Sequence, residues 1–161
     1  MAHAGRRCSR NVELGATAPV LVSACLAGVA CRYNGLGAPH PAVLRLVGQG
    51  RALLVCPEVL GGLGIPRAPV ELRAGRALER GGRDLTAAFE AGARKALELA
   101  LAAGCSRAIL KARSPSCGAG KVYDGGFGGV LTPGDGIFAA LLKAEGFALC
   151  TEEDLPHEAE G

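Results

Sequence analysis

The chain has 161 residues, 49% of them hydrophobic, and a net charge of +3. This length fits one domain that can bury a core without needing disulfides or a metal in order to fold. Basic residues are scattered and apolar runs are interrupted early, so neither a nucleic-acid-binding surface nor a membrane span is indicated.

Residues 1–18 are expected to form a flexible N-terminal tail, and they hold no apolar segment of the length that a secretory signal requires. We therefore expect a cytoplasmic protein, and disulfides are disfavoured in that compartment. Seven cysteines in a reducing environment indicate metal binding or catalysis for some of them and simple burial for others.

Apolar runs and helical periodicity predict an alternation of strands and helices. In chain order, the expected elements are a strand at 19–24, a helix at 41–47, a strand at 52–55, a helix at 85–103, a strand at 107–111, a helix at 135–145 and a strand at 147–150. The helix at 85–103 is the clearest, because its apolar residues share one face: Phe89, Ala93, Ala96, Leu97 and Ala100.

This alternation is typical of right-handed βαβ units. It predicts one compact α/β domain over 19–155, with an open parallel, Rossmann-like sheet flanked by helices, and a short tail at 156–161. Long glycine-rich loops are expected at 25–39, 57–83 and 112–134, with a small hairpin across 70–80 as an option. Long ordered loops of this kind are often functional.

Four cysteines stand in turn-forming sequence just beyond predicted strands: Cys25, Cys31, Cys56 and Cys117. Parallel strands release their loops at one edge of the sheet, so these thiols are expected to converge in space. Soft thiolates favour zinc, copper(I) or an iron–sulfur cluster, and the absence of a CxxC pair argues against a zinc ribbon. The alternative is that the four thiols are buried packing residues, as free cysteines often are.

The segments around these cysteines are SACLAGVACRYNG, CPEVLGGLGIPR and KARSPSCGAG, and the later GDGIFAALL accompanies them. Together they resemble the thiouracil/thiouridine desulfidase family over about residues 19 to 155. The resemblance implies an α/β fold that holds a [4Fe-4S] cluster on three cysteines. It also implies hydrolysis without net redox change, in which the iron free of protein ligands accepts the sulfur of the substrate.

Carried over by position, the implied cluster ligands are Cys25, Cys56 and Cys117. Cys31 is a candidate fourth ligand, and in a competing set it replaces Cys25 or Cys56. The resemblance also implies that Glu58 is the general base toward water and that Ser114 orients the substrate or relays a proton. The ordinary alternatives are a surface or helix-start carboxylate for Glu58 and a turn hydroxyl for Ser114.

Four charged residues near these motifs have open roles. Arg32 and Lys111 could offset the charge of a thiolate-bound cluster or contact a phosphate, or could be ordinary solvated side chains. Arg67 and Glu71 flank one turn, where an internal ion pair and a substrate contact are equally reasonable. Asn34 and the glycines of the segment 124–129 depart from the family pattern, and these departures concern specificity more than the cluster.

The function expected from the sequence is iron–sulfur-dependent removal of sulfur from a thiolated pyrimidine base or nucleoside, of the 2-thiouracil or 4-thiouridine type, with release of hydrogen sulfide. A small molecule is favoured over tRNA as the substrate. One alternative is a non-catalytic metal or cluster protein, such as a sensor or a sulfur-handling partner, with Cys31 as its fourth ligand. Another is a cluster-free α/β protein that binds a small molecule.

Overall fold

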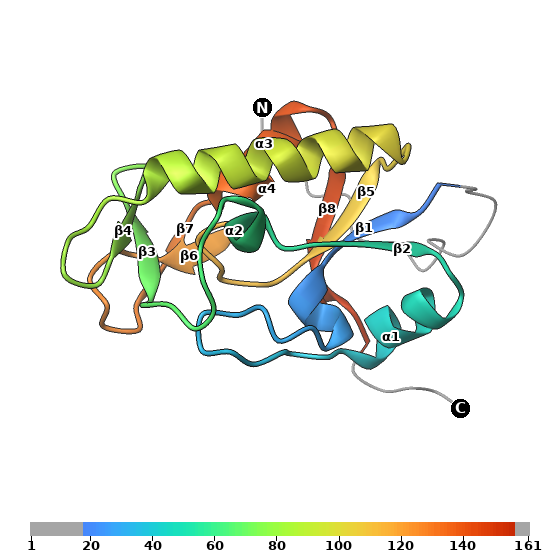
Figure 1. Ribbon diagram of the computed structural model, residues 1–161, viewed down its shortest axis with the longest axis horizontal. Helices are drawn as coiled ribbons and strands as arrows, with labels where there is room; N and C mark the ends of the chain where they lie inside the picture. Colours follow the sequence, from blue (N-terminus) through green and yellow to red (C-terminus); the bar gives the residue numbers. More distant parts are fainter. Residues whose placement is uncertain (1–17, 157–161) are drawn as a thin grey trace.

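The computed structural model describes residues 18–156, and its centre is a four-stranded parallel sheet (Figure 1). The strand order is β2-β1-β5-β8, so the chain starts in the middle of the sheet and adds strands on both sides. The strands are β1 (Val20–Ser23), β2 (Ala52–Val55), β5 (Arg107–Leu110) and β8 (Ala148–Thr151). All four match predicted strands to within one residue at each end, and the predicted parallel sheet is confirmed.

Helices cover both faces of this sheet. On one face α3 (Thr86–Ala102) and α4 (Ile137–Ala144) pack against alternate strand residues such as Leu21 and Leu110. On the other face α1 (Pro41–Gly48) contributes Val43 and Leu46 to a second core with Val20, Val22 and Ile109. Figure 1 shows α3 and α4 together on one side of the strands and α1 on the other. The apolar face predicted for α3 is buried in full.

Two antiparallel ribbons stand beside the sheet. The ribbon of β3 (Val70–Arg73) and β4 (Arg76–Glu79) confirms the optional hairpin of the sequence analysis. The ribbon of β6 (Lys121–Tyr123) and β7 (Leu131–Pro133) lies inside 112–134, where only a loop is expected from the sequence. Its strands have three residues each, too few to produce a readable alternation of apolar and polar side chains.

A single-turn helix, α2 (Pro57–Leu60), lies in another stretch predicted to be loop. It sits directly against α3, because two glycines remove the side chains that would keep the helices apart. A Cβ atom at Gly92 would lie 1.8 Å from the carbonyl oxygen of Pro57, and one at Gly61 would lie 2.2 Å from that of Ala88. The longest helix therefore fixes the position of α2 and of Glu58 upon it.

The predicted tails lie outside the described residues, apart from Ala18 at one end and Pro156 at the other. Within 18–156, no helix combines the length and the apolar character needed to cross a bilayer.

Candidate metal centre and active site

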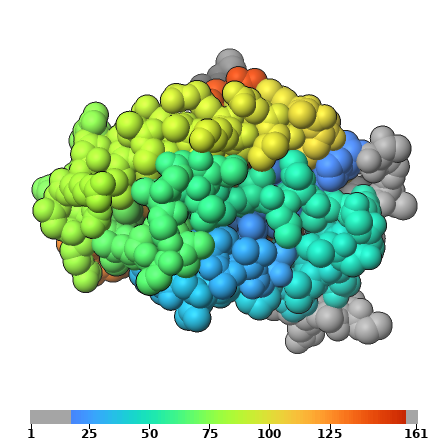
Figure 2. Space-filling view, in the orientation of Figure 1, coloured from blue at the N-terminus to red at the C-terminus, as the bar shows by residue number. Residues whose placement is uncertain are grey.

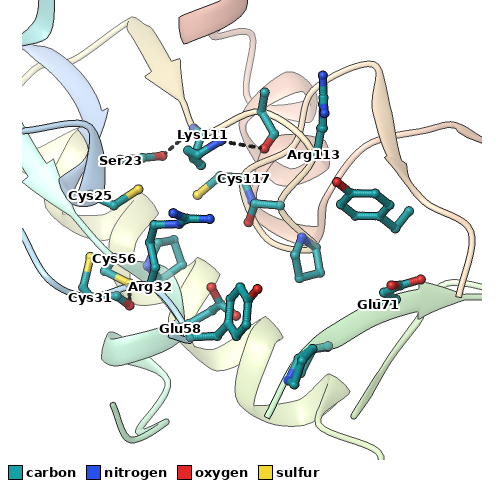
Figure 3. Close-up of a pocket in the computed structure, with 18 of the residues that line it drawn as sticks. Ser23, Cys25, Cys31, Arg32, Cys56, Glu58, Glu71, Lys111, Arg113 and Cys117 are labelled. Atoms are coloured by element: carbon teal, nitrogen blue, oxygen red, sulfur yellow. Dashed lines mark hydrogen bonds between the residues drawn. The ribbon is translucent and has the colours of Figure 1, made fainter. Parts of the chain in front are cut away.

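A cavity of about 640 Å³ opens at the carboxyl edge of the sheet. The loops that follow β1, β2 and β5 form the first wall of this cavity, which we call the cysteine wall. The two ribbons form the opposite wall, which we call the ribbon wall. Figure 3 shows the thiols and Glu58 on one side and Glu71 on the other. Figure 2 shows the segments 25–40 and 57–67 at the surface of the molecule, below α3 in this view.

All four predicted cysteines line this cavity as free thiols. Cys25 lies in the short 3-10 helix Ala24–Ala27 directly after β1, and Cys31 lies in the loop that follows. Cys56 precedes α2 as its N-cap residue, and Cys117 lies in the turn region after β5. The predicted convergence of thiols far apart in the chain is therefore what the structure shows.

Three of these thiols form a contiguous group. The Cys31 side chain is hydrogen-bonded to both Cys25 and Cys56, and the Cys56 Sγ atom also lies 3.9 Å from the carbonyl oxygen of Cys31. Cys117 belongs to the same wall but stands apart from these three thiols in Figure 3. Its thiol is hydrogen-bonded to Ser23, a residue that is not among the candidates predicted from the sequence. Nothing local marks Ser23, since its role depends on β1 and β5 being neighbours in the sheet.

The surroundings of Cys31, Cys56 and Cys117 favour the protonated form of each thiol. The hydrogen bond with Cys25 is the main cause that raises the pKa of Cys31, and the one with Cys31 is the main cause that raises the pKa of Cys56. Burial raises the pKa of Cys117 to about 12. A nucleophilic cysteine requires a lowered pKa, whereas a metal deprotonates the thiols that bind it. The site thus suits cysteines that act as ligands better than cysteines that attack a substrate.

The donor set itself fits an iron–sulfur cluster. Four soft thiols face one partly buried cavity, and cysteine thiolates are the usual ligands of such clusters. No three His, Cys, Asp or Glu side chains between residues 18 and 156 are grouped so as to hold one metal ion. The cysteine ligands of a cluster bind different iron atoms, so they need not gather around one point.

Glu58 lines the cavity from the first turn of α2, and its side chain is 17% exposed. Its Oε2 atom lies 3.3 Å from Nη2 of Arg67, and Oε1 has no hydrogen-bond partner among the described residues. Burial raises the pKa of this carboxyl, and the charge of Arg67 works in the opposite direction. The arrangement gives a carboxylate with one held oxygen and one free oxygen at the cavity.

Ser114 also lines the cavity, and it shapes the turn that carries Cys117. Its hydroxyl oxygen accepts hydrogen bonds from the backbone N–H of Ser116 at 3.1 Å and of Cys117 at 3.0 Å. The turn role considered from the sequence is therefore present. Because these contacts use only the acceptor side of the hydroxyl, its hydrogen remains available to donate to a ligand.

Arg67 and Glu71 do not pair with each other. Arg67 is bonded to Glu58, whereas Glu71 points toward the second ribbon and its Oε1 atom accepts N–H bonds from Gly125 and Phe127, both at 3.1 Å. The Arg80 guanidinium lies 5.3 Å from the centre of the Phe127 ring. These contacts attach the loop 124–129 to the first ribbon. The loop and the ribbon together form the ribbon wall of the cavity.

The two cations expected near the thiols differ in their contacts. Lys111 donates from Nζ to Oε1 of Glu152 at 2.8 Å, so its charge is already balanced. Arg32 lines the cavity, makes no ion pair with any residue in 18–156, and projects between the cysteines in the view of Figure 3. Arg32 is thus the cation near the thiols whose charge no described carboxylate balances.

Comparisons with known proteins agree with this geometry. The model of a family described as 2-thiouracil desulfurase matches residues 20–154. An uncharacterized protein, YbbK, of Bacillus subtilis (strain 168) is 40% identical over 146 residues, which cover 84% of this chain and 97% of that protein. A solved structure described as the [4Fe-4S]-dependent thiouracil desulfidase TudS superposes with a TM-score of 0.82 at 43% identity, covering 86% of this chain and 93% of that one.

Proposed function

The chain belongs to the 2-thiouracil desulfurase family, and on that premise we propose that it is an iron–sulfur-dependent enzyme that hydrolyses the C=S bond of a thiolated pyrimidine. Water supplies the oxygen of the product carbonyl, and the sulfur leaves as hydrogen sulfide with no net oxidation or reduction. The observation that carries this proposal is the convergence of four free thiols and a partly buried carboxylate on one cavity.

In this proposal Cys25, Cys56 and Cys117 hold a [4Fe-4S] cluster. Cys31 lies between two of these thiols, and its hydrogen bonds to Cys25 and Cys56 place it beside the ligand set rather than apart from it. A bound cluster supplies Lewis acidity toward the soft sulfur of a thiocarbonyl group.

Glu58 and Ser114 supply the polar chemistry. The Oε1 atom of Glu58 takes the proton of the attacking water, because no described residue holds that oxygen while Oε2 is held by Arg67. The raised pKa of the carboxyl makes it a better proton acceptor than an exposed glutamate. The Ser114 hydroxyl, anchored by two backbone N–H groups, donates its hydrogen to a polar atom of the pyrimidine ring.

The substrate class we favour is a free thiolated base or nucleoside, such as 2-thiouracil or 4-thiouridine. A cavity of about 640 Å³ lies in the ordinary range for small-molecule sites. The scattered basic residues give no extended surface for a polyanion, so intact thiolated tRNA is not favoured. A cytoplasmic location forms part of the same proposal.

The decisive experiment is anaerobic reconstitution with iron and sulfide, followed by incubation with 2-thiouracil or 4-thiouridine. We expect a brown protein that releases sulfide and the oxo-pyrimidine in equal amounts over many turnovers. A Glu58→Gln variant should keep the iron and lose most of its turnover, with a small residual rate that can still be measured. Faster release of sulfide from thiolated tRNA than from either small molecule would contradict the favoured substrate.

Two other outcomes would point to different functions. A brown protein with no turnover on any thiolated pyrimidine, and with loss of the cluster on replacement of Cys31, would favour a cluster sensor with four cysteine ligands. A colourless protein whose binding properties survive replacement of Cys25 and Cys117 would favour a cluster-free binder.

A further inference from the structure

Arg67 stands behind Glu58, on the side away from the cavity. Its side chain is 9% exposed, and it is not among the residues that line the cavity. Its guanidinium contacts two segments of the first wall at once. Nη2 donates to the Cys31 carbonyl oxygen at 2.8 Å and to Oε2 of Glu58 at 3.3 Å, while Nη1 donates to the Gly64 carbonyl oxygen at 3.0 Å.

The contacts of the Arg67 guanidinium satisfy its charge but not all of its hydrogen-bond donors. Burial of a guanidinium is costly unless its donors are satisfied and its charge is paired. Here one carboxylate pairs with Arg67, and the buried Nε atom of Arg67 has no hydrogen-bond partner. The backbone N–H of Arg67 already bonds the carbonyl oxygen of Tyr33 at 2.8 Å, which joins the same two segments without the side chain. The joining of the segments therefore does not by itself explain the charged group.

The geometry gives the guanidinium a more specific role. By holding Oε2, Arg67 restricts the rotation of the Glu58 carboxyl and leaves Oε1, which no described residue holds, as the oxygen available at the cavity that this side chain lines. The same nitrogen holds the carbonyl of Cys31, whose thiol contacts Cys25 and Cys56. One rigid group thus sets the carboxylate relative to the thiols. An ammonium on a flexible chain would lack this planar arrangement of donors.

We propose that Arg67 is a positioning residue of the desulfidase reaction, which acts by fixing the Glu58 carboxylate relative to the cysteine wall. This inference rests on the function proposed above. It assigns no contact between Arg67 and the substrate, and it predicts an effect on the rate of reaction rather than on substrate binding.

The test compares Arg67→Met and Arg67→Lys with the wild type after anaerobic reconstitution. For Arg67→Met we expect kcat to fall roughly 10- to 100-fold, in line with the cost of a misplaced catalytic group. KM, iron content and the electron paramagnetic resonance spectrum of the reduced protein should stay unchanged. Arg67→Lys should recover only part of the rate. Arg94→Met, which removes an exposed arginine from α3, is the matched control and should leave kcat unchanged.

The Glu58→Gln background separates positioning from a general structural role. If Arg67 acts through Glu58, adding Arg67→Met to Glu58→Gln should cause little further loss of kcat. Multiplicative losses, or iron content that falls in step with activity, would overturn the proposal and make Arg67 a structural support of the cysteine loop. If Arg67→Met does not fold, the same comparison is made with Arg67→Lys.

The failure of this inference differs from failure of the proposed function. Wild-type turnover together with an Arg67→Met variant of unchanged kcat would reject the positioning role alone. The absence of turnover in the reconstituted wild type would reject the function itself.

Discussion

The two walls of the cavity are built in different ways. The cysteine wall grows from the ends of parallel strands that contribute to hydrophobic cores on both faces of the sheet, and Cys25, Cys31 and Cys117 are each 5–6% exposed. The ribbon wall consists of short antiparallel pairs and a glycine-rich loop, joined by single contacts such as those of Glu71. The cysteine wall carries the predicted ligands and Glu58, and the ribbon wall carries the glycine-rich segment 124–129.

This difference indicates a division of labour. Ligands and a general base need fixed positions, and strand ends supported by a core provide them. A surface that selects among related pyrimidines tolerates sequence change, and loops held by a few polar contacts provide that. We therefore expect substitutions in the cysteine wall to affect reaction and cofactor content, and substitutions in the ribbon wall to affect substrate affinity.

The largest expected effect comes from Cys117→Ala. Removal of one proposed ligand should reduce both bound iron and sulfide release to background after reconstitution, since the remaining thiols cannot complete the set. Iron analysis, absorbance near the cluster band and a sulfide assay measure this. Cys105→Ala, a free and buried thiol outside the cavity, should retain both properties. Full iron content in Cys117→Ala would contradict the proposed role of Cys117 as a ligand.

Gly92→Ala tests the packing of α2 against α3, which supports the cysteine wall at Cys56 and Glu58. The added methyl would collide with the Pro57 carbonyl, so α2 must move away from α3. We expect a loss of about 1–3 kcal/mol in the free energy of unfolding, as for other overpacked sites. Urea denaturation provides the measurement.

The matched control is Gly48→Ala, also at a helical position but with open space around the new Cβ atom. It should be neutral or stabilise the protein by up to about 1 kcal/mol, because alanine favours helix more than glycine does. Equal effects of the two substitutions would contradict the close approach of α2 and α3.

Glu71→Gln tests the ribbon wall. The carboxylate accepts two backbone N–H bonds of the loop that carries Phe127, and an amide oxygen accepts such bonds more weakly. We expect KM for a thiolated pyrimidine to rise roughly threefold to tenfold, the equivalent of about 1 kcal/mol. Iron content and kcat should change little, and Glu90→Gln on the exposed surface of α3 should change neither parameter. A fall in kcat without a change in KM would break the proposed division between the walls.

The smallest expected effect is on the pH dependence of stability, through Asp84 in the loop between β4 and α3. Hydrogen bonds from Thr86, with a further contribution from Arg76, lower the pKa of Asp84 from 3.8 to about 2. A carboxylate with a lowered folded-state pKa adds stability above its unfolded pKa, and that stability is lost as the pH falls toward about 2. Asp84→Asn should therefore show a smaller decline in stability between about pH 4 and pH 2 than the wild type. Urea titrations at several pH values measure the difference, and identical pH profiles would contradict it.

Much of the cysteine wall was predictable from the sequence because its signals are local. Apolar runs mark the strands, and the cysteines that follow them are placed at one edge by the rule that parallel strands share a direction. The long α3 helix was equally clear from the spacing of Phe89 and the residues that follow it on the same face. The prediction that the four cysteines lie at one edge of the sheet therefore did not depend on any individual side-chain contact.

The remainder depended on long-range pairing. The β6–β7 strands are too short for periodicity to identify, and α2 is a single turn. The sequence left Arg67 and Glu71 as candidate partners of each other because they are neighbours in the chain, yet each pairs elsewhere. Only the folded structure shows that Arg67 reaches Glu58 and that Ser23 reaches Cys117.

The four thiols are also spread across most of the chain, from Cys25 to Cys117, and they meet only when β1, β2 and β5 are side by side. A ribosome-bound chain that lacks its second half cannot present this set of donors. Any group that requires Cys117 as well as Cys25 must therefore be inserted after synthesis has passed β5 and after β1 and β5 have paired in the sheet. Its tight binding would then draw partly folded molecules toward the native state by mass action.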